Sequence, residues 1–123
     1  RLNMDLLKIF NSALKNNLNK INIKWKDFKC MTIVLCSNGY PGRYKKNKII
    51  KNIDKITSRN NSFVFHAGTK FINGKLVSSG GRVLNIISTG KNFRKIRKNI
   101  FKILKIINWK DGFFRKDIGW RVI

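Results

Sequence analysis

The residues best suited to chemistry lie in three short strings in the second half of the chain. They are His66-Ala67-Gly68-Thr69, Gly80-Gly81-Arg82 and Arg115-Lys116-Asp117. A guanidinium beside two glycines can approach a phosphate or a carboxylate together with bare backbone. An imidazole can donate a hydrogen bond to a phosphate or a sugar hydroxyl. The sequence therefore offers Gly80, Gly81, Arg82 and His66 as candidate substrate contacts.

Each string also has a purely structural explanation. Adjacent glycines are typical of a β-bulge that needs special backbone angles, and Arg82 would then be an ordinary solvated or paired residue at a strand end. A single His after an apolar strand is more often held by a hydrogen bond within the fold. Arg115 and Asp117 could form a surface salt bridge, which contributes little to stability. Both kinds of explanation stay open at this point.

No catalytic centre or metal site is predicted in this chain. Glu is absent, the five Asp residues are scattered, and one His with two Cys gives too few ligands for zinc. Cys30 and Cys36 flank an apolar run. If that run is a strand, they lie roughly 20 Å apart at ~3.3 Å per residue, beyond the ~7 Å reach of a disulfide. We expect two free cysteines that pack in the core.

The chain is strongly basic, with a formal net charge of +23. Such a charge can indicate binding to nucleic acid. However, 54 of the 123 residues are Lys, Asn or Ile, whose codons are A/T-rich, and the basic residues are widespread rather than gathered into one arm. We favour base composition as the cause and expect no specific nucleic-acid partner. No apolar run approaches the ~20 residues that span a bilayer, and we expect a cytoplasmic protein without a membrane partner.

Hydrophobic periodicity predicts the first elements of an α+β fold. Apolar residues at helical spacing indicate an amphipathic helix over residues 2 to 18. Alternation predicts a half-buried strand from Ile23 to Phe28, and a continuous apolar run predicts a buried strand from Met31 to Cys36. Asn38 to Gly42 is a turn that lacks the phosphate-loop pattern. Residues 43 to 62 are predicted to be a surface excursion anchored by isoleucines.

The second half is predicted to contain more strands and a covering helix. Phe63-Val64-Phe65 begins a strand, Asn73-Gly74 is a strong hairpin signal, and Arg82 to Ile87 is a further strand. A helix start between Thr89 and Asn92 precedes apolar residues at helical spacing, with cations opposite them. We expect this helix to cover the sheet, with a membrane-surface helix as the alternative. Near the C-terminal end, the large aromatic side chains of the core or of an interface are expected to be Trp109, Phe113, Phe114 and Trp120.

The order of these strings resembles the C-terminal part of the phosphoribosylamine–glycine ligase family, also called glycinamide ribonucleotide synthetases, of the bacterial type. The motifs that carry the resemblance are Ser37 to Gly42, His66 to Thr69, Asn73-Gly74, Gly80 to Leu84 and Arg115 to Arg121. Arg1-Leu2 and Asp5-Leu6 extend it to the whole chain and resemble the last helix of the family's ATP-grasp core.

The resemblance implies a small antiparallel, barrel-like C-terminal domain with a covering helix, at residues 29–123. Residues 1–28 would end the ATP-grasp core. It implies a purine-biosynthesis ligase that uses ATP and Mg²⁺ to join glycine to 5-phosphoribosylamine, in a parent enzyme expected to be a monomer. The family's metal ligands lie upstream, so this segment would complete the substrate cleft without being active alone. Arg115, Lys116 and Asp117 would form a charged network against the core. The alternative is a basic nucleic-acid-binding or free-standing interaction module.

Overall fold

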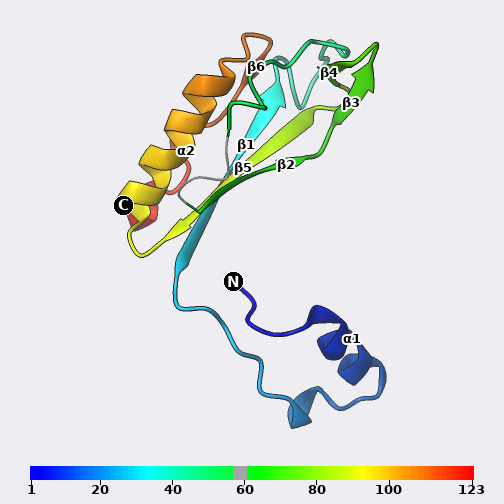
Figure 1. Ribbon diagram of the computed structural model, residues 1–123, viewed down its shortest axis with the longest axis vertical. Coiled ribbons are helices and arrows are strands. Elements are labelled where there is room, and N and C mark those ends of the chain that lie inside the picture. Colours follow the sequence, from blue (N-terminus) through cyan, green and yellow to red (C-terminus); the bar gives the residue numbers. More distant parts are fainter. Residues whose placement is uncertain (57–60) are drawn as a thin grey trace.

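The computed structural model describes residues 1–56 and 61–123, and the chain has two parts (Figure 1). A short N-terminal arm contains one helix, and the rest forms an α+β domain. The elements in chain order are α1 (Leu6–Leu14), a 3₁₀ turn (Leu18–Lys20), β1 (Lys29–Ser37), β2 (Ser62–His66), β3 (Thr69–Ile72), β4 (Lys75–Ser78), β5 (Arg82–Gly90), α2 (Phe93–Ile107), β6 (Gly112–Phe113) and a second 3₁₀ turn (Trp120–Val122).

The domain is built on a four-stranded antiparallel sheet in the order β2-β5-β1-β6. The two long central strands pair from Lys29 with Gly90 to Cys36 with Arg82, so that strands far apart in sequence form the centre of the sheet. This confirms the predicted α+β class and a strand over Met31 to Cys36. Burial alternates along that strand, because Met31, Ile33 and Leu35 face α2 whereas Thr32 is exposed and Val34 and Cys36 are half-buried.

Helix α2 covers one face of this sheet, as Figure 1 shows. Its apolar side includes Ile96, Ile100 and Ile107, which are almost completely buried, and it packs on Ile33 and Ile86 of the central strands. The helix begins where the sequence predicts, because the Asn92 side chain accepts a hydrogen bond from the backbone N–H of Lys95 (3.2 Å). The apolar side is thus used in the core, and the interpretation as a membrane-surface helix is not needed. No helix in the described part of the chain is long and apolar enough to span a bilayer.

A separate two-stranded hairpin of β3 and β4 follows the sheet's edge strand. Its turn residues Asn73 and Gly74 have positive φ angles of 48° and 70°, the backbone that a two-residue hairpin turn needs. The predicted hairpin is therefore confirmed. The chain before β2 contributes one isolated bridge, between Ile49 and Val77, and buries Ile50 in the core. The predicted excursion over residues 43 to 62 thus partly packs into the domain, although residues 57–60 lie outside the described part.

Two predictions for the first half are wrong. Ile23 to Phe28 does not form a strand: apart from an isolated bridge between Trp25 and Leu2, the segment has no sheet partner, and Trp25 is 62% exposed. The cysteines are not core residues, since Cys30 is exposed and Cys36 is half-buried. Alternation along β1 directs Met31, Ile33 and Leu35 toward α2, so both cysteines belong to the opposite face.

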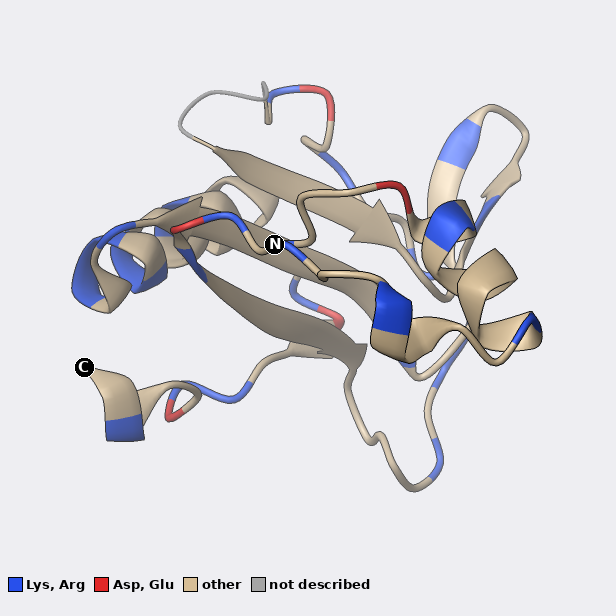
Figure 2. Cartoon of the chain, turned by 90° about the horizontal axis from the view of Figure 1, so that it is seen from below, with Lys and Arg blue, Asp and Glu red and all other residues tan. Residues whose placement is uncertain are grey.

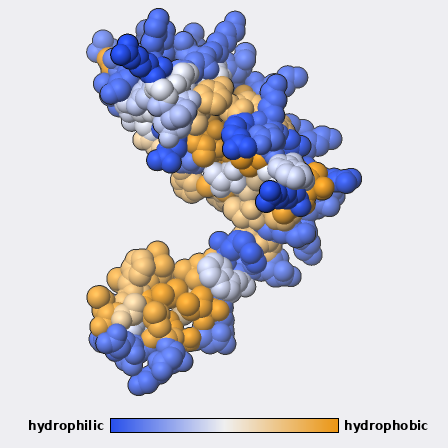
Figure 3. All heavy atoms as spheres, turned by 180° about the vertical axis from the view of Figure 1, so that it is seen from behind, coloured by the Kyte–Doolittle hydropathy of each residue, from blue (hydrophilic) through white to orange (hydrophobic). Residues whose placement is uncertain are grey.

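The N-terminal arm exposes most of its apolar residues. Helix α1 is shorter than predicted and begins after Asp5, whose carboxylate accepts a hydrogen bond from the backbone N–H of Leu7 (2.8 Å). None of its residues is buried. Figure 3 shows the arm as a largely hydrophobic body apart from the domain. The exposed apolar residues of this arm are Leu6, Leu7, Phe10, Leu14, Leu18, Ile23 and Trp25.

Basic residues are distributed over several elements. Figure 2 shows Lys and Arg on α2, on the arm and on the loops, with few acidic residues between them. On α2 they lie opposite the buried isoleucines, at Arg94, Lys95, Lys98, Lys102 and Lys105. The charge therefore forms a broad solvated surface rather than a single cleft.

Candidate functional site

The strings containing His66 and Arg82 come together at one end of the sheet. Strands β2 and β5 are antiparallel neighbours, with His66 opposite Leu84. Beyond the paired residues, the backbone N–H of Ala67 donates to the carbonyl oxygen of Val83 (3.0 Å). The backbone N–H of Gly68 donates to the carbonyl oxygen of Arg82 (2.9 Å). The end of β2 and the start of β5 thus form one corner of the domain, which we call the glycine corner: residues 66–69 and 79–82.

Glycine is required here by close approach of backbone to backbone. A β-carbon on Gly68 would lie 2.7 Å from the Cα of Gly80 and 2.6 Å from the carbonyl oxygen of Arg82. The backbone N–H of Ser79 also donates to the carbonyl oxygen of Gly68 (2.8 Å). Real β-carbons do not come this close to backbone atoms. The glycines therefore have a structural purpose at this corner, whatever else binds there.

The turn after β1 packs against the same corner. The Ser37 hydroxyl donates to the carbonyl oxygen of Gly80 (2.9 Å), and the Ser37 backbone N–H donates to that of Gly81 (2.8 Å). The predicted turn is confirmed: Gly39 has a φ of +94°, and the Tyr40-Pro41 peptide bond is cis. The ring of Tyr40 then lies beside Gly81. The contribution of Tyr40 was missed at the sequence level, since no local pattern links residues so far apart.

Arg82 projects from the corner on the side of the sheet away from α2. The pairing passes from Leu35 with Leu84 to Cys36 with Arg82, so that Val83 is an extra residue. This irregularity supports the bulge explanation for the neighbouring glycines. Arg82 is exposed and makes no side-chain hydrogen bond or ion pair within the described residues. Burial raises the pKa of the Cys36 thiol, and the nearby Arg82 guanidinium acts to lower it. A free guanidinium on a rigid strand end is suited to binding an anion.

His66 lies at the corner on the other side of the sheet. Partners in an antiparallel ladder share a face, so His66 belongs to the face of Leu84, whereas Arg82 belongs to that of Cys36. The His66 Nδ1 atom lies 2.9 Å from the Thr69 hydroxyl oxygen, within hydrogen-bonding distance. The hydrogen bond within the fold that the structural explanation required is therefore present. The structure brings the two strings together but does not direct the side chains of His66 and Arg82 into one pocket.

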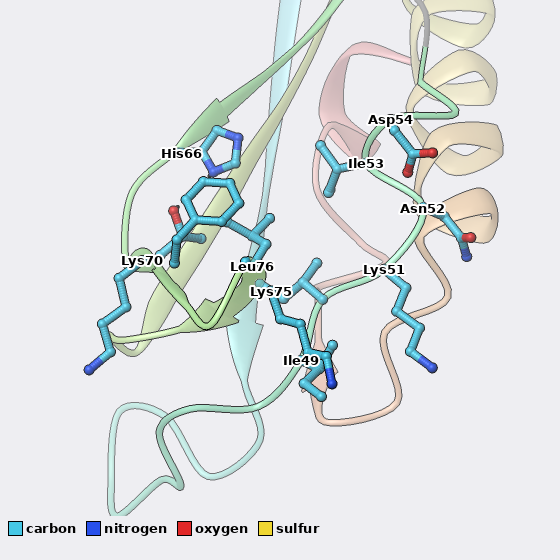
Figure 4. A pocket seen from close by; sticks show the side chains of 13 residues that line it. Ile49, Lys51, Asn52, Ile53, Asp54, His66, Lys70, Lys75 and Leu76 are labelled. Atoms are coloured by element: carbon cyan, nitrogen blue, oxygen red, sulfur yellow. Dashed lines mark hydrogen bonds between the residues drawn. The ribbon is translucent and has the colours of Figure 1, made fainter.

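A large open cavity lies between the β3–β4 hairpin and residues 49–54, with a volume of about 910 Å³ (Figure 4). In Figure 4, His66 and Leu76 face it from the hairpin side, and Ile53 and Asp54 from the opposite wall. Lys51 and Lys75 lie at its rim, while Lys70 points away from it. The lining is largely apolar, and its charged residues are Lys51, Lys70, Lys75 and Asp54.

The third string forms a surface ion pair. Arg115 Nε donates to Asp117 Oδ1 (3.1 Å) and its Nη2 to Oδ2 (2.5 Å), and both side chains are exposed. The hydrogen bond from Arg115 holds the pKa of Asp117 below its usual value. The carbonyl oxygen of Lys116 accepts a hydrogen bond from Arg97 of α2. The predicted salt bridge is thus present, and it lies on a different part of the surface from the glycine corner.

The described residues contain no group of three or more His, Cys, Asp or Glu side chains that could hold a metal ion. An acidic side chain not singled out in the sequence, Asp111, lies 3.4 Å from Lys48 and joins the β6 region to the segment before β2. Its backbone carbonyl oxygen also accepts from the N–H of Asn38 (2.9 Å). These contacts hold the turn at Asn38 to Gly42 beside the glycine corner, and their function is structural.

The fold and the corner define a small α+β domain in which one helix covers an antiparallel sheet and the exposed Arg82 guanidinium is available to an anion. A family profile described as phosphoribosylglycinamide synthetase, C domain, matches residues 30–121. The chain belongs to this family.

Individual relatives agree with this assignment. The chain is 41% identical to the phosphoribosylamine–glycine ligase of Brucella melitensis over 123 residues, which are all of this chain and 29% of that protein. It is 41% identical over 125 residues to the chloroplastic phosphoribosylamine–glycine ligase of Arabidopsis thaliana, of which 24% is covered. The crystal structure of phosphoribosylamine–glycine ligase from Thermotoga maritima shares the fold, with a TM-score of 0.68 and 24% identity over 88% of this chain and 27% of that one. The chain thus spans less than a third of these relatives.

Proposed function

We propose that this chain acts as the C domain of a phosphoribosylamine–glycine ligase and completes its substrate cleft. The support is the family match over residues 30–121 and the name that the relatives share. In the proposed reaction, ATP phosphorylates the glycine carboxylate, and the amine of 5-phosphoribosylamine attacks the acyl phosphate. The products are glycinamide ribonucleotide, ADP and phosphate. Phosphorylation is useful because it turns a poor leaving oxygen into a good one.

The observation that carries the site assignment is the free guanidinium of Arg82. It projects from a strand end that is fixed by backbone hydrogen bonds to Gly68 and Ser37. A guanidinium can hold a phosphate or carboxylate with two parallel hydrogen bonds. We assign to Arg82 the binding of an anionic group of the phosphoribosylamine substrate. The backbone of Gly80 and Gly81 is used within the corner, since Ser37 donates hydrogen bonds to both carbonyl oxygens and the Tyr40 ring lies beside Gly81.

The experiment for this assignment is Arg82→Ala in the complete ligase. Loss of a charge-assisted hydrogen-bonded contact of about 1.5–3 kcal/mol should raise the KM for phosphoribosylamine roughly 10-fold or more, with a small effect on the KM for ATP. Arg94→Ala on α2 is the matched control and should leave both constants unchanged. Unchanged kinetics in the Arg82 variant would refute the role.

We further propose that residues 1–28 end the ATP-grasp core and residues 29–123 form the C domain. The exposed apolar residues of α1 support this. Leu7, Phe10 and Leu14 would contribute hydrophobic stabilisation only if another part of the polypeptide covered them. Carboxylates elsewhere in the longer polypeptide would hold Mg²⁺, which would bind the phosphates of ATP there, so this chain is not expected to be active alone. We also propose that the parent enzyme is a monomer. We propose a cytoplasmic location as well, although one relative is named as chloroplastic.

The alternative is a nucleic-acid-binding module, which the net charge of +23 favours. Its test is the salt dependence of binding, because purely phosphate-driven affinity falls by about 10³–10⁵ between 50 and 200 mM salt for 6–10 contacts. Sequence-selective binding that survives physiological salt would support this alternative over the ligase.

A further inference from the structure

The cavity between the β3–β4 hairpin and residues 49–54 lies on the α2 side of the sheet. His66 lines it, and His66 belongs to the face of Leu84, which packs in the core with α2. Arg82 belongs to the opposite face of the sheet, and Lys70 points away from the cavity in Figure 4. The cavity is therefore a different surface from the one that Arg82 presents.

The volume and the lining of the cavity suit a small molecule. Its volume is about 910 Å³, and ligand sites commonly have volumes of roughly 300–1,000 Å³, an apolar lining and a few polar groups. The apolar part of the lining comes from the hairpin and from the segment before β2: Ile49, Ile50, Ile53, Phe71 and Leu76. The polar groups around this lining then decide which ligand fits.

Phe71 offers an aromatic surface to the cavity. Its side chain is 73% exposed, and its ring makes no contact with another aromatic ring in the described part of the chain. An exposed ring of this kind is a platform on which a planar base can stack. In Figure 4, Ile53 and Leu76 face the cavity from opposite walls, so apolar groups are available to both sides of a planar ligand.

Three charged side chains around the cavity have no partner among residues 1–56 and 61–123. Lys51 and Lys75 lie at the rim and Asp54 faces the cavity, and none of them makes a side-chain hydrogen bond or ion pair there. Two lysines from different elements can bind a phosphate through charge-assisted hydrogen bonds. The net charge of +23 adds a positive field around the chain. These features favour an anionic group at the rim.

Asp54 and His66 favour a nucleoside over an alkyl chain. An ionised carboxylate only accepts hydrogen bonds, so Asp54 needs an N–H or O–H donor, which bases carry and alkyl chains lack. The His66 Nδ1 atom lies 2.9 Å from the Thr69 hydroxyl oxygen, which leaves Nε2 without a partner in the described residues. That nitrogen can form a hydrogen bond with a ribose hydroxyl.

We propose that this cavity binds a nucleoside monophosphate, with the base on Phe71 and the phosphate between Lys51 and Lys75. Asp54 accepts a hydrogen bond from the base, and His66 bonds the ribose. The proposal goes beyond the ligase function and does not depend on it, because Phe71, Lys51, Lys75 and Asp54 take no part in the ligation described above.

The experiment is photoaffinity labelling of the complete ligase with 8-azidoadenosine 5′-monophosphate. Adducts are located by peptide mass spectrometry, and each peptide is quantified separately, so a nucleotide bound at an ATP site elsewhere is not counted. We expect saturable labelling of peptides from residues 49–54 or 66–76, with half-saturation below about 1 mM. Labelling confined to other peptides, or labelling of these that does not saturate, would overturn the proposal.

Two pairs of variants test the named groups. Phe71→Ser should raise the half-saturating concentration about 5-fold or more, because a stacking contact is lost. Ile72→Ser is its control, since the next residue along β3 lies on the other face of the hairpin and does not line the cavity. Lys75→Gln should also raise it about 5-fold or more, and Lys70→Gln, on the same hairpin, by less than about 2-fold. Equal effects within either pair would contradict the assignment.

Competition against the label separates the classes of ligand. Adenosine 5′-monophosphate should compete at about 10-fold lower concentration than adenosine or ribose 5-phosphate, because each of these lacks one recognised group. Equal competition by ribose 5-phosphate would show an anion site without base recognition, and stronger competition by octanoate would show an alkyl site; both overturn the proposal. Ligase activity is assayed separately. An active ligase without labelling contradicts the cavity proposal alone, and a labelled but inactive protein contradicts the proposed function alone.

Discussion

The ring of Tyr40 occupies the space beside Gly81 that any other residue would need for its side chain. A β-carbon on Gly81 would lie 2.1 Å from Tyr40 Cδ2 and 2.6 Å from Cε2. This contact joins the turn after β1 to the start of β5, and the hydrogen bond from Ser37 to Gly81 lies next to it. The position of Arg82 therefore depends on an aromatic ring from a distant segment.

Gly81→Ala should destabilise the domain by about 1–3 kcal/mol, because the added methyl group forces the Tyr40 ring out of its place. The measurement is urea unfolding of the 123-residue chain. Gly90→Ala is the control, since its β-carbon would meet nothing closer than 3.4 Å. The unfolding free energy of the Gly90→Ala variant should be unchanged or higher by up to about 1 kcal/mol. Equal losses for the two variants would contradict the packing explanation.

Ile100→Ala should cost about 2–5 kcal/mol of unfolding free energy, because the side chain is completely buried between α2 and the sheet. Ile106 lies on the same helix but is 42% exposed. Ile106→Ala should therefore change the stability by only about 0.5 kcal/mol. Thermal unfolding followed by circular dichroism distinguishes the two, and a similar loss at both positions would argue against the observed face of α2.

The Arg115–Asp117 pair should contribute its full stability above the ordinary carboxyl pKa. Because the pKa of Asp117 is lowered in the fold, its contribution is present at neutral pH and is lost as the pH falls through the lowered value. Arg115→Gln should return the Asp117 pKa toward its usual value in an NMR titration. Both groups are exposed, so salt should weaken the effect. A titration unaffected by the substitution would disprove the pairing.

Phe10→Ser should have effects that depend on context. In the 123-residue chain the side chain is 54% exposed, so little stability should be lost. In the complete ligase, where we expect the arm to be part of the ATP-grasp core, the same change should cost about 2–4 kcal/mol. Lys8→Ser on the same helix is the control and should be neutral in both proteins. A neutral Phe10 variant in the complete ligase would show that the core does not cover the arm.

Elements with strong local signals were predictable from the sequence. The apolar run of β1, the Asn73-Gly74 turn and the apolar periodicity of α2 each determine local structure, because backbone preference and hydrophobic burial act over a few residues. The strings around Gly80 and Arg115 also carried the family resemblance. The alternation of Ile23 to Phe28 was misleading, because within the described residues the segment pairs only through an isolated bridge between Trp25 and Leu2.

The arrangement of the candidate site was decided only by tertiary structure. A single extra residue at Val83 places Arg82 on the face of Cys36, while the uninterrupted pairing of β2 places His66 on the face of Leu84. No local pattern reveals this, because a one-residue shift in register reverses the face on which a side chain lies. The sequence by itself carried the family resemblance and suggested candidate substrate contacts, which stay a prediction. The long-range pairing of β1, β2 and β5 decided which of them share a surface, since those contacts form between segments far apart in the chain.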